Sequence, residues 1–307
     1  MKYKTLPHIS PLRYPGGKAC LTDFIDDLVY LNDLQGCPYF EPYAGGAGAA
    51  LGLLMSGAVS EVFLNDADIR IYSFWQALLS ESEQFIDNIQ QVHLTMEEWA
   101  RQREISKNPN IHDLFEVGFS TFYMNRCNRS GILSGGPIGG YQQDGKWRID
   151  VRFNRDNLSA RIEALGRLRN SIHISNLDAI DFLKTTLPRG RGRDKVFVYL
   201  DPPYVVKARK LYLNVYEAKN HADLAKYMTS QKTLPWMMSY DDCDLIRNLY
   251  SKTCTVQKLP IRYSLQIKRS AEELLITPST IDLPVALRAH EKEYSARQVS
   301  NGGTYGN

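Results

Sequence analysis

The 307-residue sequence predicts an α/β fold built on a doubly wound, mainly parallel sheet that is interrupted by an inserted lobe. Short apolar runs with the length of strands alternate with segments in which apolar residues recur at helical spacing. Glycine or acidic residues follow several of these runs directly, as they do where parallel strands lead into helices. This alternation is typical of a sheet that is covered by helices on both faces.

The N-terminal part predicts a helix, a strand, a glycine turn and a second strand in that order. The helix is expected over 19–34, since its apolar residues fall three or four positions apart. The segment "CPYFEPY" then predicts a strand that leads through "AGGAGAALGLL" into another helix, and "EVFLND" predicts the next strand. Five further strands are expected at 172–178, 196–201, 234–240, 255–263 and 273–277, with helices around 222–228 and 243–250.

Residues 70–168 break this alternation and predict an inserted helical and hairpin lobe. They begin with a helical stretch rich in Trp, Phe and Glu and end in a turn-rich segment. Asp144-Gly145 lies between "GYQQ" and "KWRIDVRF", which is a strong hairpin signal. We therefore expect one domain from 1–69 and 169–283, the lobe at 70–168, and a flexible tail at 284–307.

Composition excludes several classes of protein. The five cysteines show no spacing suited to zinc, which predicts reduced thiols and no metal site. We find neither a leader-like start nor an apolar run of about 18 residues, so a soluble, cytoplasmic protein without membrane contact is expected. The formal net charge of +3 is too small to indicate a nucleic-acid partner by itself.

A glycine cluster after the first strand predicts a ligand site. Gly45, Gly46 and Gly48 allow backbone amides to approach a ligand at a helix N-terminus, and Asp66 follows at a spacing suited to a ribose-binding acid. A nicotinamide dinucleotide site is less well supported, because Leu51 stands where the pattern needs a third small residue.

The segment "VFVYLDPPY" is the most specific feature of the sequence. Two prolines fix their own φ and hold Asp201 in extended geometry at the end of a buried strand. Because prolines lack N–H groups, the loop is expected to offer acceptors and few donors near the carboxylate. Such a site next to the Tyr204 ring suits a flat base that donates hydrogen bonds from an amine.

These motifs together resemble the Dam-type, D12 class adenine-specific DNA methyltransferases, which use S-adenosylmethionine. The resemblance rests on "LRYPGGK", "EPYAGGAG", "NRCNRSGI", "LDPPY" and "RYSLQIKRSAEELLIT", and it covers about residues 10–280. One departure is that Ala47 stands where the family commonly has a glycine. The resemblance implies a Rossmann-like fold, a cytoplasmic enzyme of bacterial or phage origin, and a monomer or weak dimer.

The resemblance also implies roles for individual residues. Catalysis is expected at Asp201, Pro202, Pro203 and Tyr204, by holding a flipped adenine for direct in-line methyl transfer. The cofactor is expected to contact Tyr14, Lys18, Glu41, Tyr43, Gly45, Asp66, Asp178 and Asp201. A cognate restriction enzyme or another defence component is the kind of protein partner that such enzymes have.

The inserted lobe carries the charge expected of a surface that binds double-stranded DNA. Residues 126–169 contain nine basic and four acidic residues. The DNA-binding candidates are Arg126, Asn128, Arg129, Tyr141, Lys146 and Arg148. Three alternatives remain open from the sequence: a cytosine-N4 methyltransferase, an RNA amino-methyltransferase and an inactive DNA-binding relative.

Overall fold

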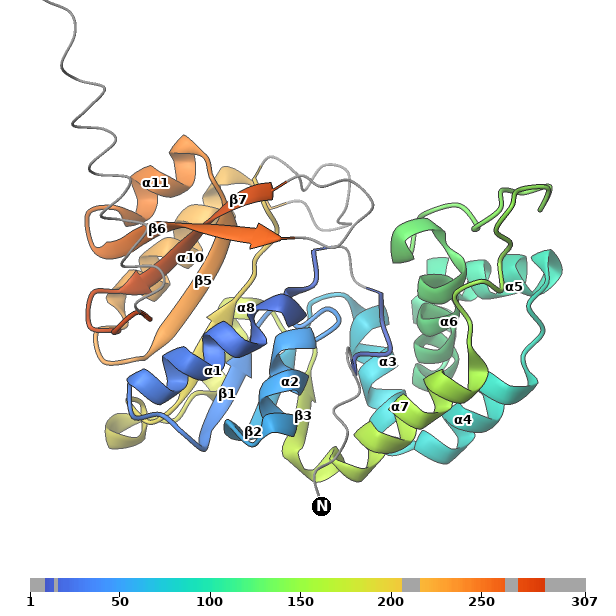
Figure 1. Ribbon diagram of the computed structural model, residues 1–307, viewed down its shortest axis with the longest axis horizontal. Helices are drawn as coiled ribbons and strands as arrows, with labels where there is room; N and C mark the ends of the chain where they lie inside the picture. The colour runs from blue at the N-terminus through green and yellow to red at the C-terminus, as the bar shows by residue number, and fades with distance from the viewer. Residues whose placement is uncertain (1–8, 14–15, 206–215, 263–269, 285–307) are drawn as a thin grey trace, which may run out of the picture.

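A computed structural model describes residues 9–13, 16–205, 216–262 and 270–284, and its centre is a seven-stranded sheet (Figure 1). The strand order is β3-β2-β1-β4-β5-β7-β6. The strands are β1 (Cys37–Glu41), β2 (Val59–Asn65), β3 (Ile172–Ser175), β4 (Phe197–Leu200), β5 (Trp236–Asp241), β6 (Cys254–Arg262) and β7 (Ser270–Pro278). The structure confirms the predicted mainly parallel α/β sheet, because only the pairings of β7 with β5 and β6 are antiparallel.

The order of the sheet reverses between β1 and β4, which pair in parallel. From β1 the chain winds outward to β2 and β3, and from β4 it winds outward in the other direction to β5. The loops that leave β1 and β4 therefore diverge to opposite faces of the sheet. Ligands of open α/β sheets bind in the crevice that forms at such a reversal, beyond the carboxyl ends of the strands.

Helices cover both faces of the sheet, as the apolar strands require. Tyr199 of β4 packs in one core cluster, whereas Val198 and Leu200 pack in the other, so the strand is buried on both sides. One face carries η1 (Lys18–Leu21), α1 (Thr22–Leu31) and α2 (Gly48–Ser56). The other carries α8 (Ala179–Thr186), α10 (Ala218–Ser230) and α11 (Asp244–Tyr250).

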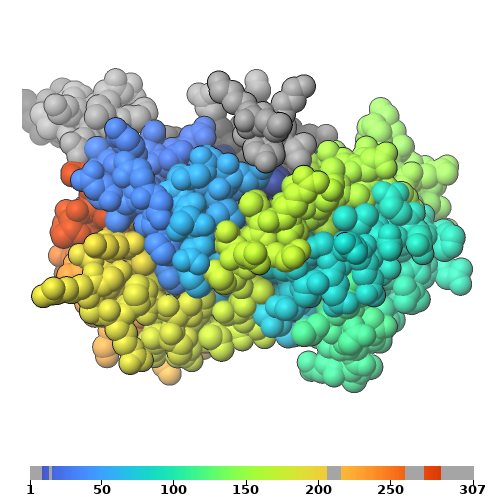
Figure 2. Space-filling view, turned by 90° about the horizontal axis from the view of Figure 1, so that it is seen from below, coloured from blue at the N-terminus to red at the C-terminus, as the bar shows by residue number. Residues whose placement is uncertain are grey.

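The chain between β2 and β3 forms a separate group of helices at one side of the sheet (Figure 1). These are α3 (Ile69–Ser80), α4 (Ser82–Gln91), α5 (Met96–Lys107), α6 (Leu114–Cys127) and α7 (Arg155–Arg167), with short 3₁₀ turns at Pro109–Ile111, Arg129–Gly131 and Arg169–Ser171. Four of them (α3, α5, α6 and α7) follow an Asp, Thr or Asn whose side chain accepts a backbone N–H of the first turn. Viewed from below, α7 crosses the surface between α2 and α4 (Figure 2).

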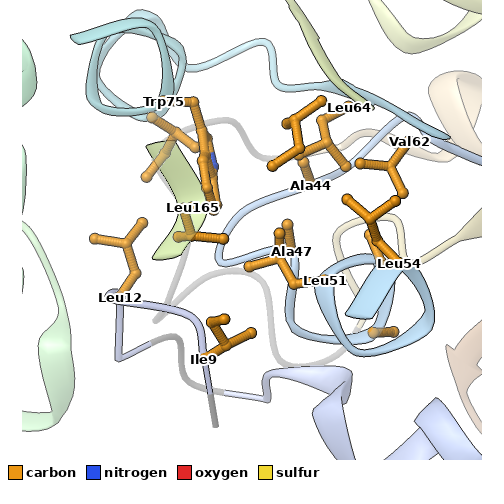
Figure 3. Packing of buried hydrophobic residues seen from close by; sticks show 14 of the residues in the cluster. Ile9, Leu12, Ala44, Ala47, Leu51, Leu54, Val62, Leu64, Trp75 and Leu165 are labelled. Carbon is orange, nitrogen blue, oxygen red and sulfur yellow. The ribbon is translucent and has the colours of Figure 1, made fainter. Parts of the chain in front are cut away.

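Trp75 of α3 connects this helical group to the glycine turn after β1. Its ring lies in the core near Ala44 and Leu165 (Figure 3), and its indole N–H donates to the carbonyl oxygen of Gly45 at 2.9 Å. The ring is fully buried, so this hydrogen bond is shielded from water. The first helix after β2 thus fixes the position of a turn that the sequence predicts to bind a ligand.

The predicted hairpin around Asp144-Gly145 is wrong, since residues 138–151 form turns rather than paired strands. Gly139, Gly140 and Gln143 all have positive φ, which is incompatible with an extended strand. Hydrogen bonds of the Gln143 side-chain amide hold this segment together, in place of backbone hydrogen bonds between paired strands. It donates to the carbonyl oxygens of Ile138 and Gly140 at 2.8 and 2.6 Å, and it accepts the N–H of Ile149 at 2.9 Å.

The predicted tail at 284–307 lies outside the described residues apart from its first position. Within the described residues, no helix has both the length and the apolar character needed to cross a bilayer.

Candidate active site

Two acidic residues meet at the reversal point of the sheet. Glu41 is the last residue of β1, and Asp201 directly follows β4, the strand that pairs with β1. Burial, and next the negative charge of Asp201, raise the pKa of Glu41. The sheet therefore joins the glycine turn and the "DPPY" loop at one edge.

The Asp201 carboxylate accepts hydrogen bonds from three side chains. Lys18 Nζ lies 2.8 Å from Oδ2, and Ser239 Oγ donates to Oδ1 at 2.7 Å. The Tyr204 hydroxyl donates to the same Oδ1 at 3.3 Å. Ser239 in turn lies 2.8 Å from the hydroxyl of Tyr199, which donates to it because the Ser239 hydrogen points to Asp201. The carboxylate is thus held in one orientation by residues of η1, β5 and the "DPPY" loop.

These donors correct the expectation that Asp201 has a donor-poor neighbourhood. The prolines do remove backbone donors, and Pro202 is buried beside the carboxylate. Side chains that are distant in the sequence, Lys18 and Ser239, supply donors in place of the missing backbone N–H groups. The sequence around Asp201 does not indicate these contacts. The loop continues through Val205, whose N–H donates to Asp241 at 3.0 Å.

Lys18 is the cation of this site and is almost fully buried. Its ammonium group donates to the Tyr204 hydroxyl at 2.8 Å and to the Gly16 carbonyl at 3.0 Å. It also lies 3.7 Å from the Glu273 carboxylate and 5.1 Å from the centre of the Tyr204 ring. One lysine therefore connects η1, the "DPPY" loop and β7, and it offsets the charges of two carboxylates.

Glu41 is a buried carboxyl group next to this cluster. The Tyr39 hydroxyl donates to Glu41 Oε2 at 3.2 Å. Burial and the negative charge of Asp201 raise the pKa of Glu41 to about 8. A raised pKa favours the protonated form of Glu41.

Asp66 closes the other side of the glycine turn. It follows β2 and accepts the backbone N–H of Gly45 on Oδ2 and that of Asp68 on Oδ1, each at 2.9 Å. Desolvation by the surrounding protein raises the pKa of Asp66 to about 7, against the effect of these two hydrogen bonds. Ala47, the departure from the family's glycine, adopts a left-handed φ of 48° just before α2. The turn thus keeps the conformation that a glycine would adopt without steric cost.

The predicted cofactor residues Tyr43 and Asp178 lie near a third residue, Tyr216. The hydroxyls of Tyr43 and Tyr216 are 2.8 Å apart, and the two rings meet edge to face. Asp178 is exposed and accepts the N–H groups of Ile180 and Asp181 at the start of α8. Burial, with a smaller contribution from the negative charge of Asp178, raises the pKa of Tyr216 to about 12. Tyr14 lies outside the described residues.

The structure separates the predicted DNA-binding residues into two groups. Arg129, Tyr141, Lys146 and Arg148 are exposed on the turns after α6. The expectation of base contacts is wrong for Asn128, which is fully buried, accepts from the Trp99 indole at 2.8 Å and donates to Ile132 and Leu133. Arg126, another predicted DNA-binding residue, is also buried, and its guanidinium group donates to the Pro11 carbonyl.

Several residues of the site are absent from the sequence prediction. Ser239 and Glu273 reach the cluster from β5 and β7, and Trp75 reaches the glycine turn from α3. A polar residue inside the otherwise apolar run "WMMSY" is a signal that could have identified Ser239. Within the described part of the chain, no group of three metal-ligating side chains comes together.

Solved structures that match this chain have low sequence identity to it. A conserved hypothetical protein from Streptococcus pyogenes has a TM-score of 0.34 at 11% identity, over 81% of this chain and 89% of that one. The rRNA methyltransferase AviRa from Streptomyces viridochromogenes has a TM-score of 0.32 at 14% identity, over 83% of both chains. SMU.472, crystallised in complex with SAH, has a TM-score of 0.36 at 11% identity, over 84% of this chain and 52% of that one.

Family membership follows from the sequence of the domain that builds the site. A search of curated proteins finds no match to the chain. The family description "D12 class N6 adenine-specific DNA methyltransferase", by contrast, matches residues 14–262, which include η1, the glycine turn, Asp66 and the "DPPY" loop. This span is most of the chain and contains the ion pair of Lys18 with Asp201. The chain therefore belongs to the D12 class N6 adenine-specific DNA methyltransferase family.

Proposed function

We propose that this protein transfers a methyl group from S-adenosylmethionine to the exocyclic N6 amine of adenine within a short sequence of double-stranded DNA. The observation that carries the proposal is the position of Asp201. Its carboxylate lies at the reversal point of the sheet, next to the strand whose following turn is joined to Asp66. An acceptor for an amine and a site for a ribose therefore share one edge of the sheet.

The residues around the glycine turn fit the proposed cofactor. The partly exposed Asp66 is an acceptor at the end of β2, where it can receive ribose hydroxyl groups. Tyr43 and Tyr216 supply aromatic edges for a flat adenine ring near Asp178, while Gly45 gives close backbone approach. Bound S-adenosylmethionine would supply an electrophilic sulfonium methyl group, and its transfer releases S-adenosylhomocysteine.

Asp201 and the Pro202 carbonyl would accept the two hydrogens of the target amine. The lone pair of an adenine amine is delocalised into the ring, so the amine is a weak nucleophile. Holding both hydrogens favours a pyramidal nitrogen whose lone pair points at the methyl carbon. The N–C bond would form as the S–C bond breaks, and the methylated nitrogen would afterwards lose its proton to solvent water.

The Asp201 carboxylate accepts three hydrogen bonds from described residues, two on Oδ1 and one on Oδ2. The amine would take the remaining acceptor position of Oδ2, or replace Lys18 on Oδ2 or Tyr204 on Oδ1 in an exchange of donors. Tyr204 would then present its ring to the flipped base, while Ser239 keeps the carboxylate in place. Lys18 would remain near Glu273 during this exchange.

The helical group between β2 and β3 is the proposed DNA-recognition lobe. Residues 70–168 would contact DNA, and 1–69 with 169–283 would carry out catalysis. The exposed Arg129, Lys146 and Arg148 suit phosphate or base contacts, and Tyr141, which is 61% exposed, suits stacking. Arg126 and Asn128 would support this surface from inside the lobe rather than touch bases.

The test is transfer of a labelled methyl group from S-adenosylmethionine to unmethylated genomic DNA, with total RNA as the competing substrate. We expect label in DNA, recovered as N6-methyladenine after digestion. Asp201→Asn should lower the rate at least 100-fold while S-adenosylhomocysteine binding stays within about threefold. Label in N4-methylcytosine, in RNA alone or in neither polymer would contradict the proposal. Base flipping is tested by a rise in fluorescence when 2-aminopurine replaces the target adenine.

A further inference from the structure

Four arginines gather where the N-terminal segment crosses the helical group. They are Arg13 before η1, Arg126 on α6, Arg161 on α7, and Arg152 in the last turn before α7, whose positive charge acts on Arg13 and Arg126. Arg126 donates to the carbonyl of Pro11, and Arg161 donates to the carbonyl of Ser10 at 3.0 Å. Residues 10–13 therefore lie between α6 and α7, with guanidinium groups on either side.

The hydrogen bonds of this cluster orient the arginines but do not neutralise them. Arg13 donates to the Asn128 carbonyl at 3.4 Å, and its own backbone is held by Asn125, which accepts its N–H and donates to its carbonyl. All of these acceptors are neutral. Among the described residues, no carboxylate lies within ion-pair distance of Arg13, Arg126, Arg152 or Arg161.

Burial makes this uncompensated charge costly. Arg126 is only 8% exposed, and the Nε atoms of Arg126 and Arg161 are buried without an acceptor among the described residues. Burial, then the positive charges of Arg161, Arg13 and Arg152, lower the pKa of Arg126 to about 9. Burial and Arg152 also lower the pKa of Arg13. Guanidinium groups so placed are strongly stabilised by an anion.

We propose that Arg13, Arg126, Arg152 and Arg161 form a binding site for one backbone phosphate of the DNA. A phosphodiester offers planar pairs of acceptor oxygens that match the fork of arginine N–H donors. The inference that the phosphate belongs to DNA rests on the proposed function. Phosphate contacts fix the position and register of a protein on DNA but carry no information about the base sequence. The site would therefore add affinity for DNA of any sequence.

The location of the site gives it a second role. Residues 10–13 lead toward Lys18, which contacts Asp201 and Tyr204. Ser10 also donates its hydroxyl hydrogen to the carbonyl of Gly46 in the glycine turn. A phosphate bound by these arginines would therefore fix the segment that connects the recognition lobe to both halves of the active site.

The test measures how the affinity for DNA changes with salt concentration. Each phosphate contact that is lost makes the slope of log Kd against log salt concentration smaller. The exposed Arg152 is replaced by Gln, and Arg161→Gln is a second variant in case one of them folds poorly. We expect about a tenfold loss of affinity for target and unrelated duplexes alike, and a log Kd against log salt slope reduced by about one. Arg152→Lys, which keeps the charge, should recover part of the affinity.

The matched control is Arg167→Gln on the same helix as Arg161. Arg167 is exposed and pairs with Glu163 four residues earlier, so its replacement should leave the salt slope unchanged. A slope unchanged in both Arg152→Gln and Arg161→Gln, or changed equally in Arg167→Gln, would overturn the site. If the wild-type protein binds DNA with these effects but methylates nothing, the phosphate site stands and the proposed function fails.

Inorganic phosphate distinguishes a DNA site from a site for a small anion. The melting temperature is measured in phosphate and in chloride at equal ionic strength. If phosphate raises the melting temperature of the wild type, and raises that of Arg152→Gln less, the proposed anion contact is supported. The same stabilisation together with an unchanged DNA salt slope would overturn the assignment to the DNA backbone.

Discussion

Lys18 and Asp201, 183 positions apart in the sequence, form an ion pair of 2.8 Å at the reversal point of the sheet. The lysine side chain is 4% exposed and that of the aspartate 19%, so water screens the pair only weakly. The same ammonium group reaches Glu273 and Tyr204. One buried cation therefore stabilises the acid to which we assign the target amine.

Replacement of Lys18 by Met should destabilise the fold. Asp201 and Glu273 lose this cation while they remain in a poorly solvated site, a loss that typically costs about 3 kcal/mol. The free energy of unfolding, measured by urea denaturation, should fall by about that amount. In the double variant Lys18→Met, Asp201→Asn, the neutral amide should recover part of the loss. If the double variant instead loses the sum of the stabilities lost in the two single variants, Lys18 and Asp201 are not coupled.

Cofactor binding should strengthen as the pH rises through about 7. The Asp66 carboxyl has a pKa raised to about 7, and hydroxyl donors of a ribose favour its charged form. The affinity for S-adenosylhomocysteine should therefore increase up to tenfold per pH unit below pH 7 and level off above it. Calorimetric titration between pH 5.5 and 8.5 measures this dependence.

The control for that prediction is Asp66→Asn. The amide does not titrate, so the affinity should be low and independent of pH in the same range. A wild-type affinity that does not change between pH 5.5 and 8.5 would rule out Asp66 as the acceptor of the ribose hydroxyls.

Glu41 should make the free protein less stable as the pH rises. Its folded pKa of about 8 exceeds the usual value of 4.5, so the folded state binds a proton more tightly than the unfolded state. The resulting stabilisation is complete below about pH 4.5 and is lost as the pH rises through 8. Thermal unfolding from pH 5 to 8.5 should show a steeper decline in the wild type than in Glu41→Gln. Asp66 also titrates in this pH range, but it is present in both the wild type and Glu41→Gln. The difference between their pH dependences therefore reports on Glu41 alone. Parallel declines in the two proteins would contradict the prediction.

Gln143 should control the turns that replace the predicted hairpin. Gln143→Ala removes three hydrogen bonds that join residues 138–149, which is worth about 1 kcal/mol or more of local stability. Trypsin should then cleave after the exposed Lys146 and Arg148 about tenfold faster. Gln142→Ala changes an exposed neighbour of the same type and should leave the rate unchanged. Equal rates in both variants and the wild type would show that the amide does not hold these turns.

The periodicity of the sequence was enough to predict the sheet, because strands buried on both faces have continuous apolar runs. The run at 196–200 is such a case, and β4 occupies Phe197–Leu200. The segment 144–152 shows the limit of this reasoning. A dipeptide suited to a hairpin was overridden by the Gln143 side chain, whose contacts depend on positive φ at Gly139, Gly140 and Gln143 itself.

The sequence by itself determined the stiff ending of β4, the glycine turn, and the placement of Asp66 and Asp201 after strands, because these depend on local covalent geometry and apolar patterning. Only the tertiary structure decided what surrounds each carboxylate. Lys18, Ser239 and Glu273 come from three separate elements, and their contacts depend on the strand order and on how η1 packs. The same reason explains why Asn128 is buried and Arg129, its neighbour, is exposed, since side-chain burial depends on packing among distant helices.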